Sequence, residues 1–307
     1  MSLDDNRLAS SLCGVALRNP VLAASGTFGY GVEFERQVDL NDLGALVVKG
    51  LSREPMEGNA PPRIWETPAG MLNSIGLQNI GVQAFVRDKL PQLARLRTAV
   101  FANIFGYATE DYVEVVRALE AAEGLAGYEL NVSCPNTRHG GIFFSSDPAL
   151  LAEVVTAVKR VARRPVIVKL SPNVAAIEPL TRAAEESGAD AISLVNTFVA
   201  LAVDARTRRP RLGAGFGGLS GPAIKPIALR LVYQAAQAVK IPVIGLGGIA
   251  TGEDAAEFLV AGACAVEVGT ATFWDARSPV RVARELGEFL KKEGISNVRE
   301  IVGTLKM

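Results

Sequence analysis

Short apolar runs alternate with longer amphipathic segments along most of the chain. The runs are four or five residues long, and most are followed by a segment whose apolar positions recur at helical spacing. Strands and helices that alternate in this way are typical of a parallel sheet with crossover helices. The predicted strands are Pro20–Ala24, Ala45–Val48, Val100–Ile104, Tyr128–Asn131, Val166–Leu170, Ala191–Val195, Val243–Leu246 and Ala265–Val268.

The amphipathic segments predict the helices that join these strands. The first connection, around Gly31–Leu40, is the poorest helix candidate. Ser187–Asp190 and Ala261–Ala263 each contain a glycine that would end a helix directly before a strand. The predicted helices are Val82–Arg95, Ala108–Ala122, Ala149–Val161, Ala175–Ser187, Ile224–Val239, Glu253–Ala261 and Val280–Glu293.

Eight strand-then-helix units in 307 residues match a (β/α)8 TIM barrel. A doubly wound open sheet is the rival interpretation, because a strand count does not establish closure. No linker-like or low-complexity segment divides the chain, so we expect one domain over residues 1–307.

Two connections are too long to be simple crossovers. They are Gly50–Gly81, which is rich in proline, and Thr197–Pro222, which is rich in arginine and glycine. Excursions of this length in a compact domain are usually lids, binding loops or interfaces. Both follow the C-terminal ends of predicted strands, so we expect long insertions at that face of the barrel, next to Cys134 and a substrate pocket.

Composition and charge exclude several classes of protein. The chain is 49% hydrophobic and 21% charged, with a formal net charge of zero, which gives no reason to expect nucleic acid or an anionic membrane as a partner. No apolar run approaches the ~20 residues needed to span a bilayer. The first residues are acidic and do not predict a signal peptide.

The three cysteines, Cys13, Cys134 and Cys264, are far apart, which fits free thiols in a reducing cytoplasm. His139 is the sole histidine, and neither CxxC nor HExxH occurs. We therefore expect no zinc site built by the protein.

The segment Asn131–Gly141 is the strongest candidate for chemistry. It follows a predicted strand and presents a thiol, carboxamides and a hydroxyl before a glycine-rich loop. Polar groups at such a strand end often form active sites. Cys134 is either a base or nucleophile with a lowered pKa or a small apolar filler, and these residues alone leave both interpretations open.

The last two predicted strands end in glycine-rich turns, Gly245–Gly248 and Gly269-Thr270. Such loops in barrels commonly bind phosphate through backbone N–H groups, and Thr251 is placed to cap the helix that follows. Gly245-x-Gly247-x-x-Ala250 with Glu267 downstream also fits a dinucleotide-binding fingerprint. The late position in the chain favours the barrel phosphate site.

Two lysines, Lys49 and Lys169, lie at the C-terminal ends of apolar strands. An ammonium there requires an anionic or polar partner, either an ion pair inside the barrel or a ligand. With Asn103 and Asn131 at neighbouring strand ends, they favour an anionic, planar ligand rich in hydrogen-bonding groups, such as a nucleotide or a flavin.

Several blocks then occur in the order of a known family: Asn73–Asn79, Asn131–Asn136, Val168–Asn173 and Gly217–Pro222. Together with Asn19–Gly26 and Gly262–Thr270, they make the chain resemble class 1 dihydroorotate dehydrogenases nearly from end to end. These enzymes are flavin-dependent oxidoreductases of pyrimidine (UMP) biosynthesis.

The resemblance implies one FMN per chain, with its phosphate at the two glycine-rich turns. It also implies that Lys169 stabilises negative charge near the pyrimidine end of the flavin. The implied FMN-binding residues are Ser25, Lys49, Gly50, Asn103, Asn131, Lys169, Val195, Gly221, Gly247, Gly248, Gly269 and Thr270.

The resemblance further implies oxidation of (S)-dihydroorotate to orotate. Cys134 would be the base that removes a ring proton, while flavin N5 accepts a hydride on the opposite face. The loop from Pro135 to Phe144 would close over the substrate. The implied substrate contacts are Lys49, Asn73, Ser74, Ile75, Gly76, Leu77, Asn131, Asn196 and Thr197.

Among the class 1 enzymes, the stretches Gly76–Asn79 and Gly217–Pro226 look most like class 1B. That resemblance implies a homodimer core joined to a partner subunit with FAD and a [2Fe–2S] cluster, in a heterotetramer that passes electrons to NAD+. Three scattered cysteines cannot ligate such a cluster within this chain.

Other functions stay open. One is class 1A, a homodimer that uses fumarate as the oxidant, and another is a different FMN barrel that oxidises or reduces a dihydropyrimidine. A non-redox phosphate-binding barrel with Lys169 as a Schiff-base lysine is a third. A barrel-shaped binding module without turnover is the last.

Overall fold

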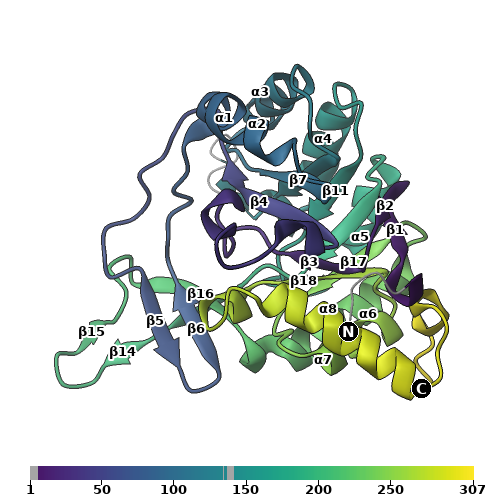
Figure 1. The fold of residues 1–307 in the computed structure, drawn as a ribbon. Coiled ribbons are helices and arrows are strands. Elements are labelled where there is room, and N and C mark those ends of the chain that lie inside the picture. Colours follow the sequence, from purple (N-terminus) through teal and green to yellow (C-terminus); the bar gives the residue numbers. More distant parts are fainter. Residues whose placement is uncertain (1–5, 134, 137–141) are drawn as a thin grey trace.

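The computed structural model describes residues 6–133, 135–136 and 142–307, and at its centre is a closed barrel of eight parallel strands (Figure 1). The barrel confirms the (β/α)8 TIM fold and excludes the doubly wound open sheet. Each predicted strand is present within a few residues of its expected bounds. In chain order the barrel strands are β3 (Val21–Ala23), β4 (Ala45–Leu51), β7 (Ala99–Ile104), β8 (Gly127–Asn131), β11 (Val166–Lys169), β12 (Ala191–Leu194), β17 (Val243–Leu246) and β18 (Ala265–Val268).

Helices follow seven of the barrel strands and surround the barrel. The first connection contains only the short 3-10 helices η2 (Val32–Phe34) and η3 (Leu40–Asp42), as its weak pattern indicated. The remaining helices are α1 (Gly81–Ala84) and α2 (Leu90–Leu93), α3 (Thr109–Glu120), α4 (Pro148–Lys159), α5 (Glu178–Glu186), α6 (Lys225–Ala238), α7 (Gly252–Val260) and α8 (Ser278–Lys292). No helix in these described ranges is both long and apolar enough to cross a bilayer.

Prolines explain the two main differences from the predicted helix bounds. A π-helical turn at Phe85–Lys89 divides the helix expected over 82–95, because Pro91, the second residue of α2, has no N–H to donate to the carbonyl four residues earlier. Helix α5 begins at Glu178 and not at Ala175, because Pro179 is accommodated only in a first turn.

The half of the barrel interior near the N-terminal ends of the strands is apolar, and a hairpin closes that end of the barrel. This hairpin pairs β1 (Ser10–Leu12) with β2 (Val15–Leu17) and was not predicted. Its side chains Leu12 and Leu17 join a buried cluster with inward-facing residues of the barrel strands: Leu22, Ala45, Val47, Phe101, Ile167, Ala191, Ile244 and Ala265. The N-terminal end of the barrel is therefore a packed core.

Two residues further along several of these strands, the interior becomes polar. Side chains of a strand alternate between faces, so the residue after next lies on the same inward side. Phe101 is thus followed by Asn103, Ile167 by Lys169, and Ala265 by Glu267. Glu129 on β8 and Ser193 on β12 belong to the same layer, and all five are buried. This polar layer separates the apolar core from the C-terminal mouth.

The two long insertions pair with each other in one antiparallel sheet beside the mouth. β5 (Ile64–Thr67) and β6 (Gly70–Asn73) come from the first insertion, and β13 (Phe198–Leu201) and β16 (Phe216–Ser220) from the second. The strand order is β13-β16-β6-β5. The hairpin of β14 (Val203–Asp204) and β15 (Arg209–Pro210) extends from this sheet beyond the barrel (Figure 1).

We expect the β1–β2 hairpin, which closes the N-terminal end of the barrel, to contribute measurably to the free energy of unfolding. Leu12→Ala would leave a cavity under the strands and lower the free energy of unfolding by about 2–5 kcal/mol. Leu305→Ala, at an exposed leucine, is the matched control and should change it by less than about 0.5 kcal/mol. Denaturant titrations of both variants would test this, and equal stabilities would show that the hairpin does not support the barrel.

Candidate active site

One cavity of about 880 Å³ opens at the C-terminal end of the barrel, between the strand ends and the insertion sheet. Every residue that the family resemblance implied for FMN or substrate lines this cavity, except Cys134, which lies outside the described residues. The implied residues that line it are Ser25, Lys49, Gly50, Asn73, Ser74, Ile75, Gly76, Leu77, Asn103, Asn131, Lys169, Val195, Asn196, Thr197, Gly221, Gly247, Gly248, Gly269 and Thr270.

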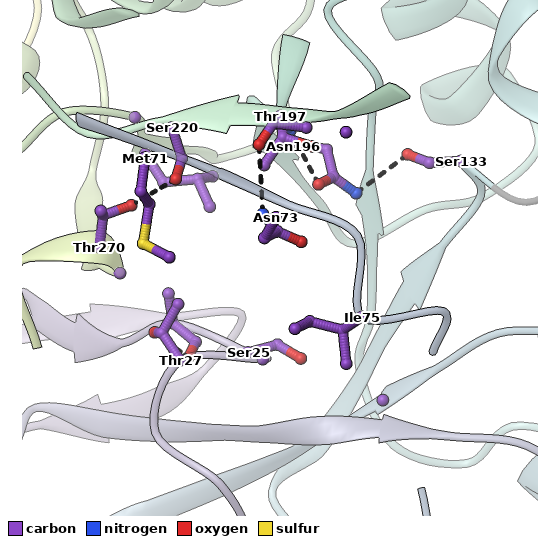
Figure 2. Close-up of a pocket in the computed structure, with 18 of the residues that line it drawn as sticks. Ser25, Thr27, Met71, Asn73, Ile75, Ser133, Asn196, Thr197, Ser220 and Thr270 are labelled. Carbon is purple, nitrogen blue, oxygen red and sulfur yellow. Dashed lines mark hydrogen bonds between the residues drawn. The ribbon is translucent and has the colours of Figure 1, made fainter. Parts of the chain in front are cut away.

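A network of amides and hydroxyls forms one wall. Asn196 donates from Nδ2 to Asn131 Oδ1 at 3.2 Å and to Ser133 Oγ at 3.1 Å, and its own Oδ1 accepts from the Thr197 N–H at 2.8 Å. Figure 2 shows Asn196 between Thr197 and Ser133. These bonds hold the carboxamides in fixed orientations, which favours recognition of a planar ligand by hydrogen bonds.

The insertion sheet supplies the side of the cavity opposite Ser25 and Thr27 (Figure 2). Asn73, at the end of β6, donates from Nδ2 to the Gly218 carbonyl at 3.3 Å, which ties the first insertion to the second. Gly218 must be a glycine, because a Cβ there would lie 2.1 Å from Thr197 Oγ1. The bond to Gly218 therefore fixes the position of Asn73, and close packing within the second insertion fixes that of Thr197.

The polar layer of the barrel forms the cavity floor around Lys169. The ammonium of Lys169 lies 3.5 Å from Glu129 Oε2 and 3.4 Å from Glu267 Oε2, and the three side chains are 0–6% exposed. Burial alone would lower the pKa of Lys169, but attraction to the two carboxylates outweighs it and raises that pKa. Lys169 is thus held charged by an ion pair inside the barrel, one of the two alternatives for this residue.

Lys49 is in a different environment, although it lines the same cavity. Burial lowers the pKa of Lys49, repulsion from Arg63 lowers it further, and attraction to Glu33 raises it by less. Within the described ranges, no carboxylate forms a salt bridge with Lys49. Two cationic side chains that meet in a cavity without a paired carboxylate favour binding of an anionic ligand there.

The glycine-rich turns after β17 and β18 form the far end of the cavity. Gly247 and Gly248 have φ of +124° and +85°, which other residues rarely adopt, and a Cβ on Gly248 would lie 2.8 Å from Lys225 Cβ. Thr270 donates from Oγ1 to Ser220 at 2.8 Å, which joins this end to β16. The exposed backbone of these turns can hold a phosphate.

The N-terminus of α7 is not free for such an anion. Asp254 accepts hydrogen bonds from the Ala250 and Thr251 N–H groups, each at 2.8 Å, and Thr251 Oγ1 accepts from the Asp254 N–H at 3.1 Å. Thr251 therefore caps the helix, as expected. A phosphate would have to bind the glycine turns before the helix.

Sequence reasoning missed several residues that line the cavity or its floor. Arg63 lies in the first insertion, and its guanidinium bonds to the Asn59 carbonyl and to Gln78 Oε1 at 2.9 Å. Glu129 and Glu267 were not identified as site residues, although a carboxylate inside an apolar strand is itself a signal of a buried polar partner. Ser193 has no such signal.

The two described cysteines lie at the other end of the barrel. Cys13 is in the turn of the β1–β2 hairpin and Cys264 precedes β18. Both pack against the apolar cluster at the N-terminal end of the barrel. Burial raises the pKa of each thiol to about 12. Both therefore behave as packing residues.

Comparison with known proteins agrees with this geometry. The sequence model of the dihydroorotate dehydrogenase family matches residues 7–290. The chain is 78% identical over 300 residues to a putative dihydroorotate dehydrogenase A (fumarate) of Solibacter usitatus, covering 98% of this chain and 99% of that protein.

Two further relatives are named dihydroorotate dehydrogenase B (NAD(+)), catalytic subunit. The protein of Geobacter sp. strain M21 is 50% identical and that of Geobacter sulfurreducens 52% identical, each over 300 residues, 98% of both chains. The chain therefore belongs to the dihydroorotate dehydrogenase family.

We expect the glycine turn after β17 to tolerate no side chain. Gly248→Ala combines a positive φ with a clash against the Lys225 backbone and the Gly221 carbonyl, and should lower stability by about 1–3 kcal/mol. Gly269→Ala is the control, because its Cβ would make ordinary contacts of 3.5 Å and more at a φ of −111°. Thermal unfolding would compare the two, and an unaffected Gly248→Ala would show that the turn can rearrange.

Proposed function

We propose that this chain, as one FMN-binding domain, oxidises (S)-dihydroorotate to orotate in pyrimidine biosynthesis. The observation that carries the proposal is the single cavity described above. It combines an amide wall, two cationic groups and a glycine-rich phosphate end, and most of these residues are at positions that match the family motifs. The family model, which matches residues 7–290 of the chain, supports the same activity.

The residues present fit FMN. The turns at Gly247-Gly248 and Gly269-Thr270 would hold its phosphate, and Lys169 with Asn103 at the floor would meet the polar edge of the ring system. A non-redox barrel with Lys169 as a Schiff-base lysine would need a free amine, but this ammonium is held by the buried carboxyl groups of Glu129 and Glu267. When bound, FMN supplies the hydride acceptor for this oxidation.

The protein's own side chains would bind and orient the substrate. Lys49 and Arg63 would attract its carboxylate, since both are cationic and line the cavity. Asn73, Asn131 and Asn196 would bond the ring amides and fix the reacting C–H bonds relative to the cofactor. Cys134, directly after Ser133 in the chain, would accept the ring proton as a thiolate.

We propose NAD+ as the final oxidant, reached through a partner subunit with FAD and a [2Fe–2S] cluster. The support is the name of the relatives at 50–52% identity, which are catalytic subunits of NAD(+)-type enzymes. The assembly would be a homodimer of this chain with two partner subunits.

Fumarate is the second candidate for the oxidant. The relative at 78% identity is named as a fumarate-type enzyme, and its similarity covers nearly the whole of both chains. A fumarate-type enzyme would need only a homodimer. The dihydroorotate half of the reaction is the same in both cases.

An anaerobic mixing experiment tests the function and the oxidant in turn. Dihydroorotate should rapidly bleach the flavin absorbance of the purified chain, and a yellow protein that stays yellow would contradict the proposed substrate. Reoxidation of the bleached protein is then followed with fumarate or NAD+. We expect neither to restore the absorbance at a useful rate without a partner subunit, and rapid reoxidation by fumarate would establish the second candidate.

Replacing the proposed base should separate cofactor binding from chemistry. Cys134→Ser should keep FMN but slow flavin reduction at neutral pH by roughly 100-fold or more, because a serine hydroxyl ionises far less readily than a thiol of pKa ~8.5. Cys13→Ser, remote from the cavity, is the control and should reduce at the original rate. An unchanged rate in Cys134→Ser would remove Cys134 from the mechanism.

A further inference from the structure

The polar layer below the cavity contains more acid than base. Its ionisable members are Lys169 from β11, Glu129 from β8 and Glu267 from β18, one potential positive and two potential negative charges. All three are buried, with exposures of 5%, 0% and 1%. If both carboxyl groups were ionised, a net negative charge would remain inside the barrel without a counterion, which is costly.

The two carboxyl groups have unequal partners. Glu129 accepts from Ser193 Oγ at 2.8 Å and from Asn103 Nδ2 at 2.5 Å, besides its contact with Lys169. Glu267 accepts from Lys169 at 3.4 Å and interacts with the carboxyl group of Glu129, and its Oε1 is buried with no hydrogen-bond partner among the described residues. Donors stabilise an ionised carboxylate, so the negative charge belongs on Glu129.

The residues that pair with Glu267 on the neighbouring strands could not balance a negative charge on its side chain. On the neighbouring strands its register partners are Leu246 of β17 and Leu22 of β3, neither of which can titrate. The charged groups that act on it from across the barrel are Glu129, which repels its charge, and Lys169, which attracts it. Burial and then repulsion from Glu129 raise the pKa of Glu267.

We propose that Glu267 carries a proton in the folded protein and acts, with ionised Glu129, as a positioning residue that holds the Lys169 ammonium at the cavity floor. The floor then has one positive charge, one negative charge and one neutral acid. Lys169 stays charged and fixed, and no excess negative charge lies under the ligand.

The role for ligand binding rests on the proposed function, but the protonation of Glu267 does not. A floor without net charge leaves Lys169 able to stabilise negative charge that develops on the bound ring system. An ionised Glu267 would cancel that effect, since it is as close to the ammonium as Glu129 is.

Stability as a function of pH tests the protonation directly. In the unfolded chain Glu267 ionises near pH ~4.3, whereas in the folded protein it would keep its proton to much higher pH. Between these two values the folded state holds one more proton, so stability falls as pH rises. Relative to Glu267→Gln, the unfolding equilibrium constant of the unmodified protein should therefore increase about tenfold per pH unit across this window.

The purified chain and Glu267→Gln would be unfolded with denaturant at several pH values between weakly acidic and neutral. Glu293→Gln, at an exposed glutamate, is the matched control and should give curves parallel to those of the unmodified protein. Parallel curves for Glu267→Gln as well would mean that Glu267 is ionised. An opposite slope would mean that the folded protein binds fewer protons than the unfolded chain. Either result would overturn the proposal.

A second comparison tests whether Glu267 helps to hold Lys169, and it shows whether the Glu267→Gln variant still folds. Glutamine is neutral and similar in shape to a protonated glutamate, so Glu267→Gln should keep FMN and its rate of reduction by dihydroorotate within about threefold at neutral pH. In the background of Glu129→Gln, Glu267 becomes the only counterion of Lys169, and adding Glu267→Gln should then cause a far larger loss of stability than in the unmodified protein. Equal losses in both backgrounds would contradict the arrangement.

These measurements distinguish the two proposals. If the chain bound no FMN, the proposed function would fail, but the pH dependence of unfolding would still decide the state of Glu267. If FMN bound and was reduced while the slopes were parallel, only the inference about Glu267 would fail.

Discussion

The burial of one ammonium at the centre of a closed barrel is the constraint on which the site depends. Lys169 remains charged there because the carboxyl groups of Glu129 and Glu267, on two other strands, both lie within 3.5 Å of its ammonium. The same layer marks the change from the packed apolar interior below to the open cavity above. The residues of this layer therefore affect both the stability of the barrel and the binding of a ligand in the cavity.

The strands and the face that carries the site could be predicted because both follow from local patterns. Short apolar runs specify buried parallel strands, and polar residues at their C-terminal ends must then lie together. Position in the family motifs predicted the cavity-lining residues, although their roles await the experiments proposed. Two features had no local pattern. Pairing of the insertions joins Asn73 to Gly218, which are 145 residues apart, and Glu129 and Glu267 become partners only when the barrel closes.

The relatives of this chain are named for two different oxidants, whereas the role proposed for the cavity is in the dihydroorotate half of the reaction. Proteins named for fumarate and for NAD+ match the chain over nearly its whole length, so the barrel and its floor are compatible with either name. The features that determine the oxidant must then lie where electrons leave the cofactor. In this fold the insertion sheet beside the mouth exposes the apolar side chains of Val199 and Phe216.

The pairing of β18 with β3 also has a consequence for synthesis on the ribosome. Val21 pairs with Val266 in the closed barrel, so the first barrel strand lacks one of its two neighbours until the last barrel strand has been synthesised. Until then β3 has an open edge, and Lys169 can meet Glu129 but not Glu267. The nascent chain must therefore remain an incomplete sheet with an unsatisfied interior until β18 has been synthesised, and only then can it form its cavity.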